Sequence, residues 1–428
     1  MKNKILNLGN NFLKHELVSG SAFIFVGALI GNILAFVLNL FLARNLSYAD
    51  YAIYASLASV ITLAAIPSGS MTTVIVKFAT NFFVEKQIDK LKNFYTLFLK
   101  FVMVLSLLMI VLFIAFSVPL KSYLHIDNVW YVIVLGLIIS SFYLNALNTA
   151  FLQSILKFKF IAVVDIIGSV FKLTAGVVLV LLGYRVFGGL GALFSMAFGM
   201  YLVAYFPLFK IFKKATLNKK IALNIKEIFF YAIPTFLTIL FMTSFTSTDV
   251  ILVKHFFAPQ EAGFYSGLSL IGKVIFYFTS VIPIVMFPLL IKRHAARKSF
   301  NNLFYLALVL VLIPSVGISL FYFAFPNFVI NLFLGGRGYL SISGYLGLFG
   351  IYMTIFSLVN VCVNFFLSLN KTNVSLFVIS TAILQVVLIY IFHANFYQVI
   401  FSSLAALTVL LIILLYLFFK NYGSLKSS

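Results

Sequence analysis

Acidic residues and cysteine are scarce in this sequence. Nine Asp and Glu residues stand against 30 Lys and Arg in 428 residues, and Cys362 is the single cysteine, which excludes an intramolecular disulfide framework. The five histidines lie in different predicted loops without the spacing of metal ligands. They are His15, His125, His255, His294 and His393. With so few groups for acid, base or metal chemistry, we expect no catalytic site, no metal and no cofactor.

Apolar residues dominate instead. They make up 63% of the chain and charged residues only 9%, a composition that a soluble globular domain cannot bury in one core. Twelve apolar segments are each about long enough, at roughly 20 residues, to cross the hydrocarbon of a bilayer. They are 18–43, 51–76, 95–118, 129–153, 160–183, 186–209, 228–253, 262–290, 303–324, 343–367, 374–392 and 397–419. Because these runs lack the alternation of a barrel strand, the sequence predicts an all-α polytopic membrane protein with 12 transmembrane helices.

Basic residues alternate along the chain. They concentrate before the first segment and in every second gap after it. The remaining gaps hold only Arg44, Lys121, Arg185, Lys254 and Arg337. Since positive charge stays on the cytoplasmic side, both termini are predicted to be cytoplasmic.

The net charge of +21 raises the question of an acidic partner. The basic residues stand in short gaps beside the ends of predicted helices, where they meet anionic lipid head groups. We therefore expect contacts with anionic membrane lipids and no nucleic-acid partner.

The two halves of the chain resemble each other weakly. Residues 41–57 align with 252–268, which pairs Asp50 with Glu261, and a second alignment pairs Asn145 with Asn360. Six spans in each half make the repeat parallel. The resulting prediction is an N-terminal six-helix lobe at 1–212, a basic cytoplasmic linker at 213–226 and a C-terminal six-helix lobe at 227–428. Chance recurrence of similar loop chemistry is the alternative.

Two lysines fall deep within predicted spans, Lys172 in 160–183 and Lys273 in 262–290. A charge at the bilayer centre costs about 2.5–3.5 kcal/mol, so it faces a cavity or a partner. Lys172 either binds an anionic substrate or pairs with Asp165, seven residues earlier on the same helix face. Lys273 has no acid at helical spacing, which favours substrate binding. Asp249 is its distant ion-pair candidate and also a candidate for a coupling cation.

Polar residues in the first two spans are further candidates. Asn32 and Ser70 are placed to hydrogen-bond a sugar, or alternatively to hydrogen-bond between helices.

Three stretches resemble a known family. They are 41–47 with Tyr51 to Tyr54, Asp249-Val250 followed by 262–266, and 331–335. They are similar to Wzx-type polysaccharide flippases of the multidrug/oligosaccharidyl-lipid/polysaccharide (MOP) exporter superfamily. The resemblance implies two MATE-like lobes around a central cavity, with Lys273 in its wall and alternating access. It also implies transport of undecaprenyl-pyrophosphate-linked repeat units from the inner to the outer leaflet.

Three functions are weighed. The first is a flippase in the bacterial cytoplasmic membrane that supplies O-antigen, capsule or another surface polymer, with the polymerase and other export machinery as candidate partners and H⁺ or Na⁺ as candidate coupling ions. The second is a cation-coupled exporter of small molecules or drugs, which is expected to carry acids where this chain has lysines. The third is a membrane polysaccharide polymerase or ligase, which needs a large outer loop with catalytic Arg or His. The longest outer gap, 325–342, is short.

Overall fold

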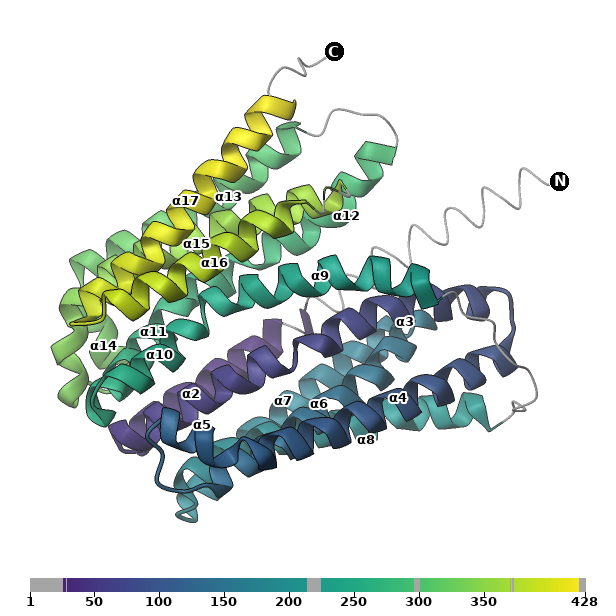
Figure 1. The fold of residues 1–428 in the computed structure, drawn as a ribbon, viewed down its shortest axis with the longest axis horizontal. Coiled ribbons are helices and arrows are strands. Elements are labelled where there is room, and N and C mark those ends of the chain that lie inside the picture. Colours follow the sequence, from purple (N-terminus) through teal and green to yellow (C-terminus); the bar gives the residue numbers. More distant parts are fainter. Residues whose placement is uncertain are drawn as a thin grey trace. The chain divides into compact units, whose positions relative to one another are not determined.

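The computed structural model describes residues 26–27, 29–213, 225–295, 301–369, 371 and 373–422 (Figure 1). In this part of the chain every regular element is a helix and no strand occurs. The predicted all-α fold is confirmed.

A helix at Leu29–Asn45 comes first among the described elements. The helices that follow up to residue 212 are α2 (Tyr48–Ala64), α3 (Ile66–Val84), α4 (Ile88–Ala115), α5 (Ser117–Tyr123), α6 (Trp130–Ser154), α7 (Phe158–Leu181) and α8 (Arg185–Phe212). From residue 225 they are α9 (Ile225–Phe245), α10 (Thr248–Phe256), α11 (Pro259–Thr279), α12 (Val281–Ala295), α13 (Asn301–Ala324), α14 (Pro326–Leu334), the 3₁₀ helix η1 (Arg337–Ile342), α15 (Ser343–Ser368), α16 (Val374–Ile391) and α17 (Phe396–Tyr422).

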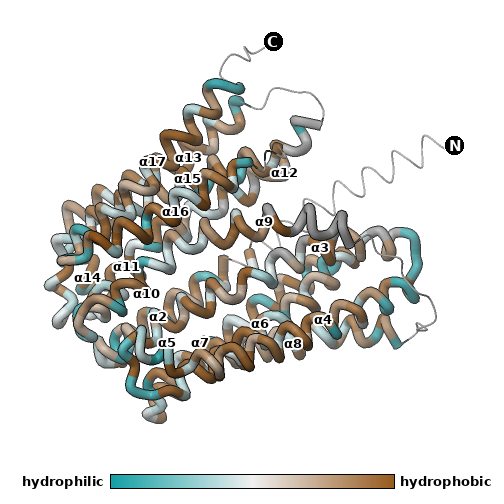
Figure 2. Tube along the Cα trace, in the orientation of Figure 1, coloured by the Kyte–Doolittle hydropathy of each residue, from teal (hydrophilic) through white to brown (hydrophobic). Residues whose placement is uncertain are grey.

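Ten helical stretches of the described residues are long and apolar enough to cross a membrane, or eleven if α9 and α10 form one span bent by 46°. Figure 2 shows apolar residues along most of their lengths. The first predicted span, 18–43, begins largely outside the described residues, so the count of twelve and the side of the termini stay predictions. The chain is a multi-pass membrane protein.

One predicted span, 228–253, is broken, because it falls in α9 and α10, which are bent by 46°. Residues 51–76 and 262–290 are interrupted only by single turn residues, at Ala65 between α2 and α3 and at Ser280 between α11 and α12, and the helical stretches Tyr48–Thr80 and Pro259–Ile284 each count as one span. The break after α9 lies in a stretch rich in Ser and Thr at 243–248, in which the Ser244 and Thr246 hydroxyls bond to nearby carbonyls and compete with the helix. Hydropathy alone does not detect such a break.

The chain divides into two compact units. The first contains Met1–Phe41, Ala64–Lys121 and Asn128–Ala232, and the second contains Leu42–Leu63, Ser122–Asp127 and Ile233–Ser428. Two short segments from the first half of the sequence thus belong to the second unit. The boundaries of the predicted lobes stay a prediction, since most of the linker at 213–226 lies outside the described residues.

Buried polar side chains join the helices of the first unit. Asn148 of α6 is fully buried, accepts a 2.8 Å hydrogen bond from the Tyr95 hydroxyl of α4, and donates a 3.2 Å bond to the Tyr201 carbonyl of α8. Nearby, the Tyr143 hydroxyl donates to the Ala64 carbonyl at 2.6 Å, where α2 gives way to α3. Such bonds hold helices together where lipid offers no hydrophobic drive for association.

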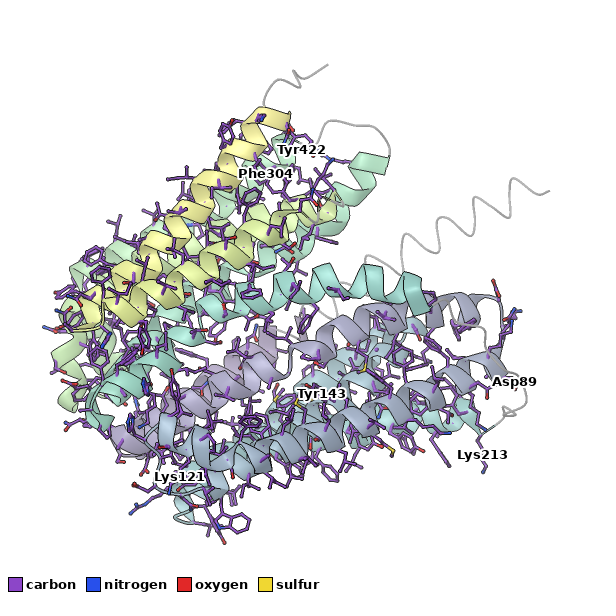
Figure 3. All side chains as sticks on the ribbon, viewed as in Figure 1. Asp89, Lys121, Tyr143, Lys213, Phe304 and Tyr422 are labelled. Atoms are coloured by element: carbon purple, nitrogen blue, oxygen red, sulfur yellow. The ribbon has the colours of Figure 1, made fainter. Side chains whose placement is uncertain are left out.

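An aromatic cluster holds one end of the second unit. Phe304 of α13 lies 4.4 Å from Phe365 of α15 and 4.3 Å from Phe418 of α17, measured between ring centroids. The Asn301 amide donates to the Tyr422 carbonyl at 2.8 Å, which ties the start of α13 to the end of α17. Phe304 and Tyr422 lie at the same end of this unit (Figure 3). α15, with α11, α13 and α17 packed around it, is the centre of the unit.

Replacing Asn148 by leucine removes the link among α4, α6 and α8 and leaves the Tyr95 hydroxyl without its acceptor. We expect the free energy of unfolding to fall by about 1 kcal/mol. A lower thermal midpoint of the purified protein in detergent is the measurement. Thr174→Val is the control, because the Thr174 hydroxyl is exposed and bonds only within α7. Equal midpoints for the two variants would contradict the assignment.

Candidate functional site

The break between α9 and α10 lies inside a bent span of the second unit. A main-chain carbonyl released from its helix inside a bilayer needs a partner from the protein. Here the Phe245 carbonyl accepts hydrogen bonds from the Tyr352 hydroxyl of α15 and from the Gln385 amide of α16, the latter at 3.0 Å. Both side chains are fully buried. Three helices therefore meet at this carbonyl.

Gln385 makes a further bond. Its amide nitrogen also donates to the Ser403 hydroxyl of α17 at 2.9 Å, whereas its carbonyl oxygen, Oε1, is buried without a hydrogen-bond partner. Burying an acceptor without a donor costs desolvation free energy. A bound water or ion is one explanation for such a group in a folded protein.

Asp249 stands in the first turn of α10, where the positive end of the helix dipole stabilises a carboxylate. It is fully buried. The Tyr265 hydroxyl of α11 donates to its Oδ2 at 3.0 Å, and the main-chain amides of Asp249 and Val250 add weaker hydrogen bonding to the carboxylate. No donor of good geometry reaches Oδ1. We call Asp249, Tyr265, Tyr352, Gln385 and Ser403 the break cluster.

Lys273 lies eight residues after Tyr265 on α11 and is half-buried. It attracts the Asp249 carboxylate electrostatically. Among the described residues, however, no carboxylate oxygen lies within 4.0 Å of its ammonium. The attraction therefore lowers the cost of this charge but leaves the ammonium free of an ion pair.

The break cluster contains oxygens of the kind that bind small cations. Asp249 Oδ1 and Gln385 Oε1 are buried without a hydrogen-bond partner, whereas the Phe245 carbonyl is already occupied by its two donors. Carboxylate, amide and carbonyl oxygens are the ligands that hard cations bind, and a proton on the carboxylate would serve the same electrostatic purpose. Lys273, near this cluster, can attract an anion.

In the first unit, Lys172 of α7 is buried with 9% of its surface exposed, and Asp165 is half-buried about two turns earlier on the same helix. The two do not form an ion pair within 4.0 Å, and no other described carboxylate does so with Lys172. The Ser169 hydroxyl between them bonds to the Asp165 carbonyl at 2.8 Å. The charge of Lys172 thus has no acidic partner in this part of the structure.

The two remaining candidates lie near the start of the chain. Asn32 is exposed on the helix Leu29–Asn45. Ser70 belongs to α3, but its side chain lies outside the described residues. Neither is brought to the break cluster by a described contact.

Gln385 and Tyr352 were not predicted as site residues. A lone amide in the apolar stretch 374–392 was the available signal for Gln385, because a polar side chain inside a membrane helix needs a partner. Tyr352 carries no such signal, since tyrosine is frequent throughout this chain.

Comparisons with known proteins agree with this architecture. Residues 41–343 match the family described as polysaccharide biosynthesis protein. An uncharacterized membrane protein, MJ1375, of Methanocaldococcus jannaschii is 25% identical over 274 residues, which are 54% of this chain and 65% of that protein. The match thus spans somewhat less than two thirds of this relative.

Solved structures show the same fold. An inward-facing multidrug resistance MATE family transporter of the MOP superfamily has a TM-score of 0.76 at 13% identity, covering 92% of this chain and 96% of that one. The lipid II flippase MurJ, in an inward closed conformation, has a TM-score of 0.67 at 15% identity, covering 90% and 86%. A MOP superfamily transporter from Pyrococcus furiosus has a TM-score of 0.65 at 16% identity, covering 96% of each chain.

At these identities the structural likeness establishes the fold alone, whereas the family match extends over most of the chain. The protein belongs to the polysaccharide biosynthesis family and has the fold of MOP superfamily transporters.

Proposed function

We propose that the protein is a flippase that carries undecaprenyl-pyrophosphate-linked oligosaccharide units from the inner to the outer leaflet of a bacterial cytoplasmic membrane by alternating access. The observation that carries the proposal is Lys273, a cation without an ion pair in the interior of a membrane helix of a polysaccharide biosynthesis protein. Transport of this kind needs no catalytic group.

The chemistry of the substrate fits this lysine. The pyrophosphate that joins lipid and sugar is anionic, and moving it through hydrocarbon without a counter-charge is prohibitively costly. An ammonium held without an ion pair inside the span offers that counter-charge. Lys172, buried in the first unit without an acidic partner, is the second candidate for the same anion.

The polar part of the substrate requires hydrogen bonds as well as charge. We assign Asn32 and Ser70 to the sugar, because they lie in the first two spans, which carry part of the family resemblance. The structural likeness to a lipid II flippase supports a lipid-linked substrate. Polymerase and other export machinery are the expected partners downstream.

The break cluster is the proposed coupling site. A proton or Na⁺ bound to Asp249 would give its Oδ1 the partner that it lacks. It would also neutralise the carboxylate and so weaken the electrostatic attraction between Asp249 and Lys273. Lys273 would then be freer to bind the anion, so that cation and substrate binding favour each other. Asp165 is the secondary candidate for this role in the first unit.

A cation-coupled exporter of small molecules is the second candidate, favoured by the fold shared with multidrug transporters. Such an exporter would use Asp249 to bind cationic drugs. The nearby Lys273 opposes this, because it repels a cationic ligand from the same region.

Reversing the charge of Lys273 tests the flippase proposal. In cells whose own gene is replaced, Lys273→Glu should reduce surface polymer at least about tenfold, because attraction to the pyrophosphate becomes repulsion. Lipid-linked oligosaccharide should accumulate on the inner leaflet, measured by lipid extraction and leaflet-specific labelling. Lys273→Arg should retain transport.

Lys371→Glu is the matched control, because it makes the same change of net charge at an exposed loop position. Membrane levels of all variants are compared by immunoblot. Normal polymer from a properly inserted Lys273→Glu protein would refute the role of Lys273.

Removing the charge of Asp249 tests the coupling site. In proteoliposomes, flipping of a fluorescent lipid-linked oligosaccharide should depend on an imposed H⁺ or Na⁺ gradient for the native chain. Asp249→Asn should abolish that dependence while some gradient-independent flipping persists, because no ionisable oxygen is left to take up the cation. Glu261→Gln, at an exposed acid in the first turn of α11, is the control. Unchanged gradient dependence in Asp249→Asn would place coupling elsewhere.

A further inference from the structure

Two segments of the second unit, 42–63 and 122–127, come from the first half of the sequence. The residues directly before and after each segment belong to the first unit. The alternation of basic residues places residues 44–50 and 119–128 in gaps on one side of the membrane, and residues 254–261 and 325–342 in gaps on that same side. These four gaps are among the six predicted outer ones. The contacts between these two segments and the rest of the second unit, described next, are therefore predicted to lie at the outer end of that unit.

The first of these segments makes three contacts with the region after α13. The Arg44 guanidinium donates to the carbonyls of Leu332 and Phe333, the latter at 2.9 Å, at the C-terminal end of α14. This is where a cation best complements the helix dipole. The Gly338 amide donates to the Tyr48 hydroxyl at 2.9 Å, and the Tyr339 hydroxyl donates to the Ala43 carbonyl at 3.2 Å.

The start of α2 also packs tightly on α11. A Cβ atom at Gly263 would lie 2.1 Å from the Tyr48 carbonyl oxygen, a clash with main chain that no side-chain rotation relieves. The Tyr48 ring lies 4.8 Å from the ring of Phe264. Glycine at 263 is thus required for α2 to approach α11 this closely.

The second segment is held through α10. The His255 ring nitrogen Nδ1 lies 2.6 Å from the Tyr123 carbonyl oxygen, and the two rings stack with centroids 4.0 Å apart. The Lys254 ammonium donates to the His125 carbonyl at 3.4 Å, and the Lys254 side chain is buried.

These contacts share one property. Each of these hydrogen bonds joins a main-chain group to a side chain, and none is an ion pair between a cation and a carboxylate. Water can replace main-chain partners of this kind at the membrane surface, so the contacts can break without leaving an opposite charge buried.

We propose that Arg44, Tyr48, Gly263, Lys254 and His255 form an outer latch, which holds residues 42–63 and 122–127 on the second unit in one transport state and releases them in the other. The latch determines when the outer end opens. The inference rests on the proposed function only in that transport requires two states.

A cysteine placed at Tyr54 reports the state of the latch, because Tyr54 lies in the first segment and is 3% exposed. Cys362 is first replaced by alanine, so that Tyr54→Cys carries the single thiol of the full-length protein. Labelling by a membrane-impermeant maleimide is measured from the outer side in intact cells. Gly263→Ala should raise the labelling rate about tenfold by shifting the population toward the released state.

Gly317→Ala is the matched control. It makes the same substitution in helix α13, where an added Cβ meets no atom within 4 Å, and should leave labelling unchanged. Arg44→Ala combined with Tyr48→Phe is the second variant, which removes two latch contacts without adding bulk and should also raise labelling.

Labelling that stays at the native rate in folded Gly263→Ala, or in the double variant if Gly263→Ala does not insert, would overturn the latch. Folding is checked by size-exclusion chromatography in detergent. The assay needs no substrate, so its outcome is independent of the flippase proposal. Normal surface polymer in Lys273→Glu with increased labelling in Gly263→Ala would reject the substrate and keep the latch.

Discussion

In hydrocarbon, a main-chain carbonyl that leaves its helix has no water to bond, and the candidate site depends on how this constraint is met at Phe245. The carbonyl is satisfied from α15 and α16, so breaking the α9–α10 span requires Tyr352 and Gln385 to converge on one point. Asp249 follows directly, at the start of the second half of the broken helix. The break thus brings buried polar side chains of several helices together, and two of their oxygens, Asp249 Oδ1 and Gln385 Oε1, have no hydrogen-bond partner.

The same constraint explains what the sequence could predict. Long apolar runs must be helices in a bilayer, so the all-helical fold followed from hydropathy alone. The break in 228–253 did not, because hydropathy averages over residues and does not register where Ser and Thr hydroxyls compete with the helix. The helices α5 and α14, which lie largely in predicted outer gaps, were not predicted either, because they are too short to be recognised as membrane spans.

The residues of the proposed site could be named from the sequence only in part. Lys273, Lys172 and Asp249 were recognisable because a charge inside an apolar span is rare and needs a physical reason. Pairing depends on side-chain direction, which sequence spacing does not give. Asp165 and Lys172 share a helix face at a spacing of seven, yet form no ion pair, whereas Asp249 reaches Lys273 electrostatically from another helix. Gln385 and Tyr352 become visible only once their shared carbonyl acceptor is seen.

The central proposal is that this protein moves an anionic lipid-linked oligosaccharide across the membrane. It rests on the positive charge of Lys273 inside a membrane helix and on membership of the polysaccharide biosynthesis family. The most direct measurement is the leaflet distribution of undecaprenyl-linked oligosaccharide in cells that lack the gene. If the protein is this flippase, the lipid-linked oligosaccharide accumulates on the cytoplasmic leaflet and surface polymer is lost, and the native chain reverses both effects. Normal polymer and an unchanged leaflet distribution, accompanied by greater sensitivity to cationic drugs, would contradict it and point to a drug exporter.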